Sequence, residues 1–207
     1  MTLWAILPVK PLAKGKSRLH GCLNTDEICL LNRCLFEETY LKLQACTEID
    51  RILVVSQDEE ILEYTRQSGG IALVENQKSS LNAAVSQALD FIVENDPGMV
   101  LIVPTDLPWM TVEDLVGLLE KREAGKFMVI VPDQLQWGTN AIFISHPALL
   151  TPRFGRRSFQ KHVKQAASRS MALTVWLNKN IQRDLDNPQD LLFYNKMNLK
   201  PIHILTE

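Results

Sequence analysis

The sequence lacks the features that mark membrane-spanning, secreted and disulfide-stabilised proteins. No apolar run approaches the ~20 residues that a membrane-spanning helix needs. The first residues lack the charged leader, apolar stretch and small-residue cleavage site of a signal peptide. The four cysteines contain no Cys-x-x-Cys pair. We therefore expect a cytoplasmic protein with reduced, mostly buried thiols and no contact with a membrane.

Charge of one sign is also lacking. The chain has 207 residues and a formal net charge of -2, which argues against a protein that binds nucleic acid through bulk charge. The four histidines are scattered and form no metal-ligand spacing. Hydrophobic residues make up 46% of the chain, enough for one large core, and we see no internal repeat or linker. We expect one domain over residues 1–207.

What the sequence does contain is a regular alternation of apolar runs and amphipathic patterns. Strands are predicted at residues 3–9, 51–56, 71–75, 98–106 and 127–133. Helices are predicted at residues 25–45, 58–70, 81–93 and 111–125. A repeated strand–helix–strand order gives parallel strands with helices on both faces, so the sequence predicts an α/β fold with a mostly parallel sheet. After residue 134 the rhythm breaks, with candidate strands at 138–145 and 172–176 and helices at 156–170 and 187–198.

The position of a ligand site follows from this fold class. The run Val100–Val103 is apolar without alternation, which predicts a central parallel strand covered on both faces. Open parallel sheets bind ligands beyond the carboxyl ends of their strands. We therefore inspect the loops that follow the strands ending at Val9, Ser56, Val103 and Val131.

A basic loop, PVKPLAKGKSRL at residues 8–19, follows the first predicted strand. Lys10, Lys14, Lys16 and Arg18 crowd around Gly15. Such a loop can wrap a polyphosphate, because backbone N–H groups approach closely at a glycine and cations neutralise phosphate oxygens. The alternative is a solvated basic turn, and the Walker A pattern G-x-x-x-x-G-K-[ST] is absent.

Two acidic segments are candidates for a metal site. Asp106 follows an apolar strand and stands between Pro104 and Pro108, so it has little conformational freedom to lose. Asp184 and Asp186 share one face of an extended segment. Mg²⁺ binds through few carboxylates together with substrate phosphates. Asp106 and a second carboxylate near it would complete a site that activates phosphoryl oxygens.

Each acidic segment also has a structural alternative. Asp106 could cap the following helix, although Thr111 is better placed to do so. Asn187 or Asp186 could begin the last helix, with Pro188 in its first turn. A cap would explain one acid of the pair at 184 and 186 but not both.

Two further segments offer positions for an anion. In FGRRSFQKH (154–162), Gly155 permits a tight turn and Ser158 lies near the N-terminus of a basic helix, where free N–H groups bind phosphate. The alternative is a surface helix with a solvated basic face. In WGTNA (137–141), Thr139 and Asn140 follow a glycine turn and could hold an acid or close the turn.

The order of these motifs resembles one enzyme family. ILPVKPLAKGKSRL, VVSQD, SLNAAV, VPTDLPWM, VPD…GTNAIF, FGRRSFQKH and DLDNPQDL occur as in the 2-phospho-L-lactate guanylyltransferases and the similar phosphoenolpyruvate guanylyltransferases of coenzyme F-420 biosynthesis. The resemblance runs from about residue 3 to residue 192. Its specific pieces are K-S-R-L, the D-L-P turn, G-T-N and F-G-x-x-S-F.

The resemblance implies a Rossmann-like, GT-A-like nucleotidyltransferase fold of the nucleotide-diphospho-sugar transferase type. The implied reaction joins GTP to a small phosphorylated three-carbon acid and releases pyrophosphate, with Mg²⁺ as cofactor. Mg²⁺ would be held by Asp106 and by Asp186 or Asp184, of which Asp186 is preferred. The implied catalytic residues are Asp106, Asp186 and Lys16. The implied acceptor-binding residues are Thr139, Gly155 and Ser158. The implied GTP-binding residues are Lys10, Lys16, Arg18, Leu81 and Asn82.

The sequence departs from this family at Ser80, where a glycine is common, and at QLQW (134–137), where a glycine-rich run is common. One alternative is a sugar-phosphate or molybdopterin nucleotidyltransferase, although the first loop here is rich in lysine rather than glycine. Another is a non-catalytic nucleotide-binding domain, which would have less need for two acidic segments. The acceptor stays open between phosphoenolpyruvate, 2-phospho-L-lactate and 3-phosphoglycerate, and a homodimer is an open expectation.

Overall fold

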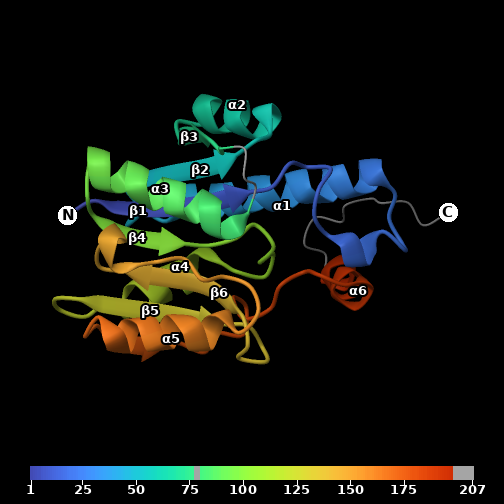
Figure 1. Ribbon diagram of the computed structural model, residues 1–207. Helices are drawn as coiled ribbons and strands as arrows, with labels where there is room; N and C mark the ends of the chain where they lie inside the picture. Colours follow the sequence, from blue (N-terminus) through green and yellow to red (C-terminus); the bar gives the residue numbers. More distant parts are fainter. Residues whose placement is uncertain (77–79, 198–207) are drawn as a thin grey trace.

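The computed structural model describes residues 1–76 and 80–197. In this part of the chain, a seven-stranded sheet in the order β3-β2-β1-β4-β6-β5-β7 carries helices on both faces (Figure 1). The strands are β1 (Leu3–Val9), β2 (Arg51–Ser56), β3 (Ile71–Val74), β4 (Met99–Ile102), β5 (Phe127–Pro132), β6 (Thr139–Ile144) and β7 (Ala172–Val175).

Most neighbouring strands are parallel, which confirms the predicted fold class. The exception is β6, which is antiparallel to both β4 and β5. The reversal occurs where the strand–helix rhythm breaks, because a short hairpin joins β5 to β6 in place of a crossover helix. As a result Thr139, the first residue of β6, lies at the edge where the parallel strands end.

The helices begin where the sequence offers capping side chains. They are α1 (Thr25–Ala45), α2 (Glu59–Gln67), α3 (Leu81–Asn95), α4 (Val112–Leu119), α5 (Ser158–Ser168) and α6 (Pro188–Lys196), with 3-10 turns η1 (Ser17–Leu19) and η2 (Pro147–Leu149). Asn24, Thr111 and Asn187 each form a capping box with the residue three positions on. Thr111 and Asn187 therefore cap the helices that Asp106 and Asp186 precede, which leaves both carboxylates free for other partners.

Strand β4 is buried on both faces, as its uninterrupted apolar run predicts. Val100 and Ile102 pack in the cluster formed with α3 and α5, which lie on the near side of the sheet in Figure 1. Leu101 and Val103 pack in the cluster formed with α1, α2 and α4 on the other face. The expected parallel pairing holds for β4 only toward β1, because β6 runs against it.

A third apolar cluster lies beyond the carboxyl edge of the sheet. It joins the first turns of α1 to α6 and to the connecting loops through Leu31, Trp109, Leu185 and Tyr194. Figure 1 shows α6 standing away from the sheet, beneath the loop that carries η1. This cluster anchors the segment that carries the second acidic motif.

Two expectations about details of the fold are wrong. Helix α4 ends at Leu119 rather than continuing to residue 125, because residues 120–126 are all exposed and offer no apolar side chain to the core. The cysteines are not mostly buried: Cys46 is buried, Cys29 and Cys34 are half-buried and Cys22 is exposed. No helix in the described part of the chain is long and apolar enough to cross a membrane.

Candidate active site

The two acidic segments meet at the carboxyl edge of the sheet, on either side of one lysine. Lys16 Nζ lies 3.2 Å from Asp106 Oδ2 and 3.1 Å from Asp186 Oδ1. The Lys16 side chain is 8% exposed, while both carboxylates are partly open to solvent. Residues separated by 90 and 170 positions in the sequence thus share one ion-pair cluster.

Backbone contacts fix this meeting point. The N–H of Leu185 donates to the carbonyl of Asp106 at 2.9 Å, and Lys16 Nζ donates to the carbonyl of Leu185. Leu185 itself is buried in the third apolar cluster, which joins α1 to α6. Lys16 has φ +47° and follows Gly15, whose φ is +99°, and this left-handed turn brings the basic loop back over the acids. The cluster is therefore held by the fold as well as by charge.

The acids outnumber the cations that face them. Burial and the charges of Asp106 and Asp186 together raise the pKa of Asp184 to about 6. Burial alone would lower the pKa of Lys16, but the two carboxylates that it contacts raise it above its usual value. The Arg18 guanidinium lies 3.7 Å from Asp186 Oδ2 and is 73% exposed, so solvent screens that pair. A further cation at this edge would be favourable.

Beside the acids opens a cleft of about 260 Å³. The sequence-predicted residues that line it are Lys10, Lys16, Leu81, Asp106 and Asp186, joined by Lys14 and Gly15 of the basic loop. The predicted GTP residue Asn82 points elsewhere: its side-chain amide pairs with both backbone groups of Phe154, at 2.7 and 3.2 Å. Arg18, Asn82 and Asp184 are not among the lining residues.

The residues of the cleft that sequence reasoning missed include Glu75 and Asn32. Glu75 is 7% exposed and follows β3, so its place at the carboxyl end of a parallel strand was an available signal. Asn32 lies on α1 and donates to the carbonyl of Leu12 at 2.7 Å, which secures the basic loop. Nothing in the local sequence around Asn32 marks that role.

The three predicted acceptor residues lie on β6, on α5 and on the segment that leads into α5, and Thr139 contacts His162 of α5. Thr139 Oγ1 lies 3.1 Å from His162 Nδ1. Gly155 has φ +102°, and its carbonyl accepts from the N–H of Ser158 at 2.9 Å. Ser158 is almost fully buried, and Arg157 precedes it in the left-handed region. Sequence reasoning set His162 aside as one of four scattered histidines.

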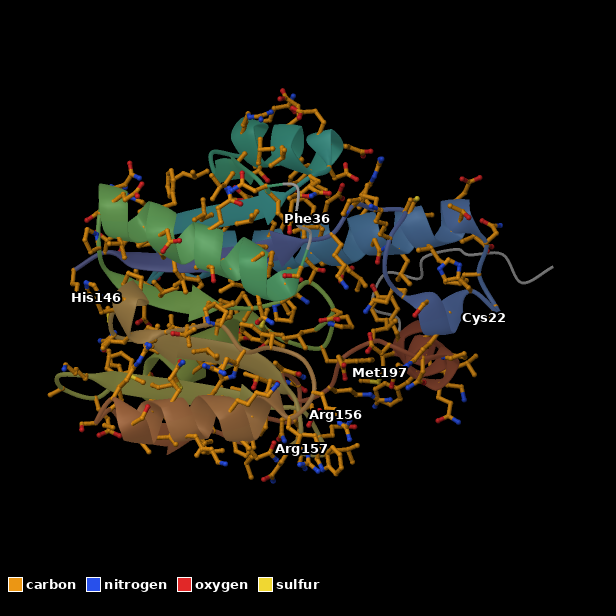
Figure 2. The ribbon with its side chains drawn as sticks, viewed as in Figure 1. Cys22, Phe36, His146, Arg156, Arg157 and Met197 are labelled. Carbon is orange, nitrogen blue, oxygen red and sulfur yellow. The ribbon has the colours of Figure 1, made fainter. Side chains whose placement is uncertain are left out.

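The β5–β6 hairpin, where the sequence departs from the guanylyltransferase pattern, is tied to the start of α5. The Asp133 carboxylate accepts from the N–H groups of Trp137 and Gly138, both at 2.8 Å. Trp137 is 55% exposed, and the Arg157 guanidinium lies over its ring at 5.9 Å. Figure 2 shows Arg156 and Arg157 at the edge where β5 ends, so a tryptophan and two arginines flank the acceptor residues.

The donor set suits Mg²⁺ bound partly by a substrate. Within residues 1–76 and 80–197, no group of three or more His, Cys, Asp or Glu side chains is arranged to hold a metal ion alone. Mg²⁺ is usually bound by one or two carboxylates plus substrate phosphates. Asp106 and Asp186 are both partly open and both contact the Lys16 ammonium, so two carboxylates lie at one edge of the cleft, as that requirement asks.

Comparison with known proteins assigns the chain to a family. The model of the CofC-like guanylyl transferases matches residues 3–194. The chain belongs to the CofC-like guanylyl transferase family. Among the relatives of this CofC-like chain, the phosphoenolpyruvate guanylyltransferase of Sphaerobacter thermophilus is 34% identical over 92% of this chain and 91% of its own. The 2-phospho-L-lactate guanylyltransferase of Methanothermobacter thermautotrophicus is 30% identical over 92% and 83%.

Solved structures agree with the fold of this CofC-like chain. A protein from Desulfovibrio desulfuricans G20, described as a nucleotide-diphospho-sugar transferase, superposes with a TM-score of 0.74 at 16% identity, over 100% of this chain and 92% of its own. A nucleotidyl transferase from Methanothermobacter thermautotrophicus superposes with a TM-score of 0.68 at 12% identity, over 95% and 97%. At such identities the likeness shows the fold, which is the nucleotide-diphospho-sugar transferase type that the sequence predicts.

Proposed function

We propose that the protein is a Mg²⁺-dependent guanylyltransferase. It joins GTP to a phosphorylated three-carbon acid, phosphoenolpyruvate or 2-phospho-L-lactate, and releases pyrophosphate, as a step of coenzyme F-420 biosynthesis. The observation that carries the proposal is the Asp106–Lys16–Asp186 cluster beside an open, lysine-lined cleft. Membership of the family and the names of its relatives support the choice of substrates.

The reaction needs charge neutralisation more than proton transfer. A phosphate oxygen of the acceptor attacks the α-phosphorus of GTP, forming one P–O bond. The bond from that phosphorus to the bridging oxygen breaks, and pyrophosphate leaves with the electron pair. The attacking oxygen is deprotonated near neutral pH, so no general base is needed. This suits a cleft whose lining, among the residues that the structure describes, includes no histidine or cysteine.

The basic loop is suited to the repulsion between two polyanionic substrates. Lys10, Lys14 and Lys16 line the cleft on one side, and Arg18 lies at its mouth near Asp186. We assign the triphosphate to these cations. Asp106 and Asp186 would hold Mg²⁺, which supplies positive charge to the phosphoryl oxygens when bound. Catalysis then rests on positioning and on fixed charge.

We assign the nucleotide base to the part of the cleft lined by Glu75 and by the start of α3, and this part suits guanine. Glu75, Ser80, Leu81 and Ala84 line that part of the cleft, at the start of α3. A carboxylate only accepts hydrogen bonds, and the N1–H and 2-amino group of guanine are two donors on one edge, whereas adenine has an acceptor at N1. Burial raises the pKa of Glu75, and Lys10 and Lys14 oppose that effect. We assign guanine recognition to the Glu75 carboxylate.

The acceptor is assigned to the second group of residues. Thr139 contacts His162, and Gly155 is bonded to Ser158 at the start of the same helix. The Phe154 ring contacts His162, and its backbone N–H donates to Asn82 of α3. The exposed Arg156 and Arg157 add positive charge at this edge. The acceptor brings a phosphate and a carboxylate, which hydroxyl groups, backbone N–H groups and guanidinium groups bind.

The test is mass spectrometry of the products. The protein is incubated with Mg²⁺, one of the four nucleoside triphosphates and one acceptor at a time: phosphoenolpyruvate, 2-phospho-L-lactate, 3-phosphoglycerate or a hexose 1-phosphate. We expect a product with the mass of the acceptor plus a guanylyl group, formed with GTP and one of the first two acids, and one pyrophosphate released per product. A nucleotide sugar as the main product would favour the sugar-phosphate alternative. GTP binding without any Mg²⁺-dependent product would favour a non-catalytic domain.

A further inference from the structure

A buried histidine stands at the centre of the acceptor side. His162 lies on the inner face of α5 and is 0% exposed. Its Nδ1 is 3.1 Å from the Thr139 hydroxyl at the start of β6. Its Nε2 accepts the backbone N–H of Arg153 at 3.1 Å. The Phe154 ring meets the imidazole edge to face, with centroids 5.0 Å apart.

These two contacts determine which ring nitrogen carries the proton. A backbone N–H can only donate, so Nε2 of His162, which faces the N–H of Arg153, must be unprotonated. A neutral imidazole then carries its proton on Nδ1. This Nδ1–H donates to Thr139 Oγ1, because that oxygen is the atom it faces. The hydroxyl proton of Thr139 is consequently directed away from the histidine.

We propose that His162 is a positioning residue that fixes the Thr139 hydroxyl as a hydrogen-bond donor to the anionic acceptor. The inference rests on the proposed function, because it deepens the role of the acceptor side. A free threonine hydroxyl can turn as donor or acceptor, and only the donor orientation suits an anion. By donating to one lone pair of Oγ1, His162 excludes the orientation in which the hydroxyl donates to the histidine, so the hydroxyl proton stays available to the ligand.

The surroundings of His162 keep it neutral. Burial lowers the pKa of His162 to about 4, and the charges of Lys161 and Arg153 act in the same direction. At pH 7 the ring therefore keeps one donor and one acceptor. A protonated ring would present two donors. The donor at Nε2 would face the N–H of Arg153, so that hydrogen bond would be lost.

The same helix provides a matched control in Gln165. Gln165 is also buried, and its side-chain amide bonds both the N–H and the carbonyl of Thr151 at 3.1 Å. Gln165 thus anchors to α5 the segment that joins η2 to α5, and His162 anchors the same segment through Arg153. The side chain of Gln165 bonds Thr151 rather than Thr139, so it shares the structural role of His162 without the proposed effect on the hydroxyl.

Three variants separate the two hydrogen bonds of His162. His162→Asn keeps an amide donor near the place of Nδ1 and loses the acceptor for Arg153. His162→Gln keeps an acceptor near the place of Nε2 and loses the donor to Thr139. Gln165→Leu removes the other anchor of the segment. Steady-state kinetics of the full chain then give the KM of GTP and of the acceptor for each variant, with the melting temperature recorded alongside.

We expect His162→Gln to raise the acceptor KM about tenfold, the effect of one hydrogen bond to a charged group, and to leave the GTP KM within about twofold. His162→Asn should restore most of the acceptor affinity. Gln165→Leu should lower the melting temperature without changing the acceptor KM. In a Thr139→Ala background, His162→Gln should add little to the acceptor KM, because its target hydroxyl is gone.

The opposite outcomes overturn the inference and can be told apart from failure of the proposed function. Equal acceptor KM values for His162→Gln, His162→Asn and Gln165→Leu would reduce His162 to a structural residue. NMR of the ¹⁵N-labelled imidazole in the wild-type chain must show the Nδ1–H tautomer, and an Nε2–H tautomer would overturn the inference whether or not the protein turns over. Absence of product with every acceptor would instead refute the proposed function.

Discussion

Around Lys16 the neighbouring side chains are charged and partly open to solvent, whereas around His162 the contacts are neutral and buried. Lys16 lies between Asp106 and Asp186, and Asp184 adds a third carboxylate to the same edge. His162 lies between a hydroxyl and a backbone N–H. On one side of the candidate site the carboxylates outnumber the cations that face them, and on the other both ring nitrogens of His162 have a hydrogen-bond partner.

The difference shows how each side is prepared for its ligand. The acidic side has more carboxylates than cations, so a bound divalent ion would stabilise it. On the neutral side the two hydrogen bonds of His162 are present without a ligand, and their geometry is set by α5, β6 and the segment before Gly155. We infer that the acidic side loses stability as the pH rises through about 6 unless a cation binds there. The neutral side depends on packing and loses stability as the pH falls from 6.5 toward 4.

The largest expected effect comes from the acidic side. Asp106→Asn should lower kcat at least about 10³-fold, because it removes one of two carboxylates assigned to the cation that stabilises the phosphoryl oxygens. Asp186→Asn should behave similarly. The melting temperature of both variants should stay close to that of the wild type, since neither side chain belongs to the core.

The control for these variants is Asp90→Asn, which changes an exposed acid of α3 and should leave kcat unchanged. Pyrophosphate release at saturating Mg²⁺ measures the effect. Wild-type turnover by Asp106→Asn would show that the acidic side has no part in the chemistry.

The second largest expected effect is a loss of stability at acid pH that arises from His162 on the neutral side. The pKa of His162 is about 4 in the folded chain and its ordinary value is 6.5, so between these values the unfolded chain binds more protons. Its contribution to stability is complete above pH 6.5 and is lost as the pH falls toward 4, by about 3 kcal/mol in all. Urea unfolding between pH 7.5 and pH 4 measures this loss.

His162→Gln supplies the comparison for that measurement, because it has no titrating ring. The stability of the variant should fall less steeply with decreasing pH than that of the wild type. Parallel stability curves for the two proteins over this interval would mean that His162 titrates normally in the folded state.

The sequence predicted the fold better than it predicted the contacts of the site. Alternating strands and helices were enough for a mostly parallel sheet, and the cap at Thr111 follows from local side-chain chemistry. The reversal of β6 was not predictable in this way, because a hairpin and a crossover differ in their tertiary partners rather than in the strand pattern itself.

Within the site, the motifs identified Asp106 and Asp186, but they did not predict the contacts that bring the two carboxylates to Lys16. Their meeting depends on the Leu185 N–H bond to the Asp106 carbonyl and on the left-handed backbone of Lys16. His162 was missed for a related reason: its partners Thr139 and Arg153 lie outside its own helix, 23 and 9 residues away, and the sequence of that helix is typical of a basic surface helix. Glu75 could have been found by inspecting the loop after β3.

A smaller effect is expected at the base end of the cleft. Glu75→Gln should reduce the preference for GTP over ATP about tenfold, because an amide offers only one acceptor to the two donors of guanine. The measured quantity is kcat/KM for each nucleotide. Inosine triphosphate, which lacks the 2-amino group, should be affected less than GTP. An unchanged GTP/ATP ratio would move base recognition to backbone groups of the cleft.

The smallest expected effect concerns Asp184 on the acidic side. Its contribution to stability falls as the pH rises, whereas that of His162 falls as the pH decreases. The folded pKa of Asp184 is about 6, above its ordinary value of 3.8, because burial and the charges of Asp106 and Asp186 disfavour the ionised form. Its contribution to stability is present below pH 3.8 and is lost as the pH rises through 6. Asp184→Asn should therefore stabilise the chain at pH 7.5, by about 1 kcal/mol once solvent screening of this half-buried group is allowed for, or about 2–4 °C in Tm.

At pH 4.5 the gain from Asp184→Asn should largely disappear, because the wild-type carboxyl is then mostly protonated in the folded state. Saturating Mg²⁺ and GTP should also narrow the difference in Tm, since a cation held by Asp106 and Asp186 offsets the repulsion that raises the pKa of Asp184. If Asp184→Asn lowers Tm at pH 7.5, the carboxylate is stabilised where it lies, and the excess of negative charge that distinguishes the acidic side from the neutral side does not exist.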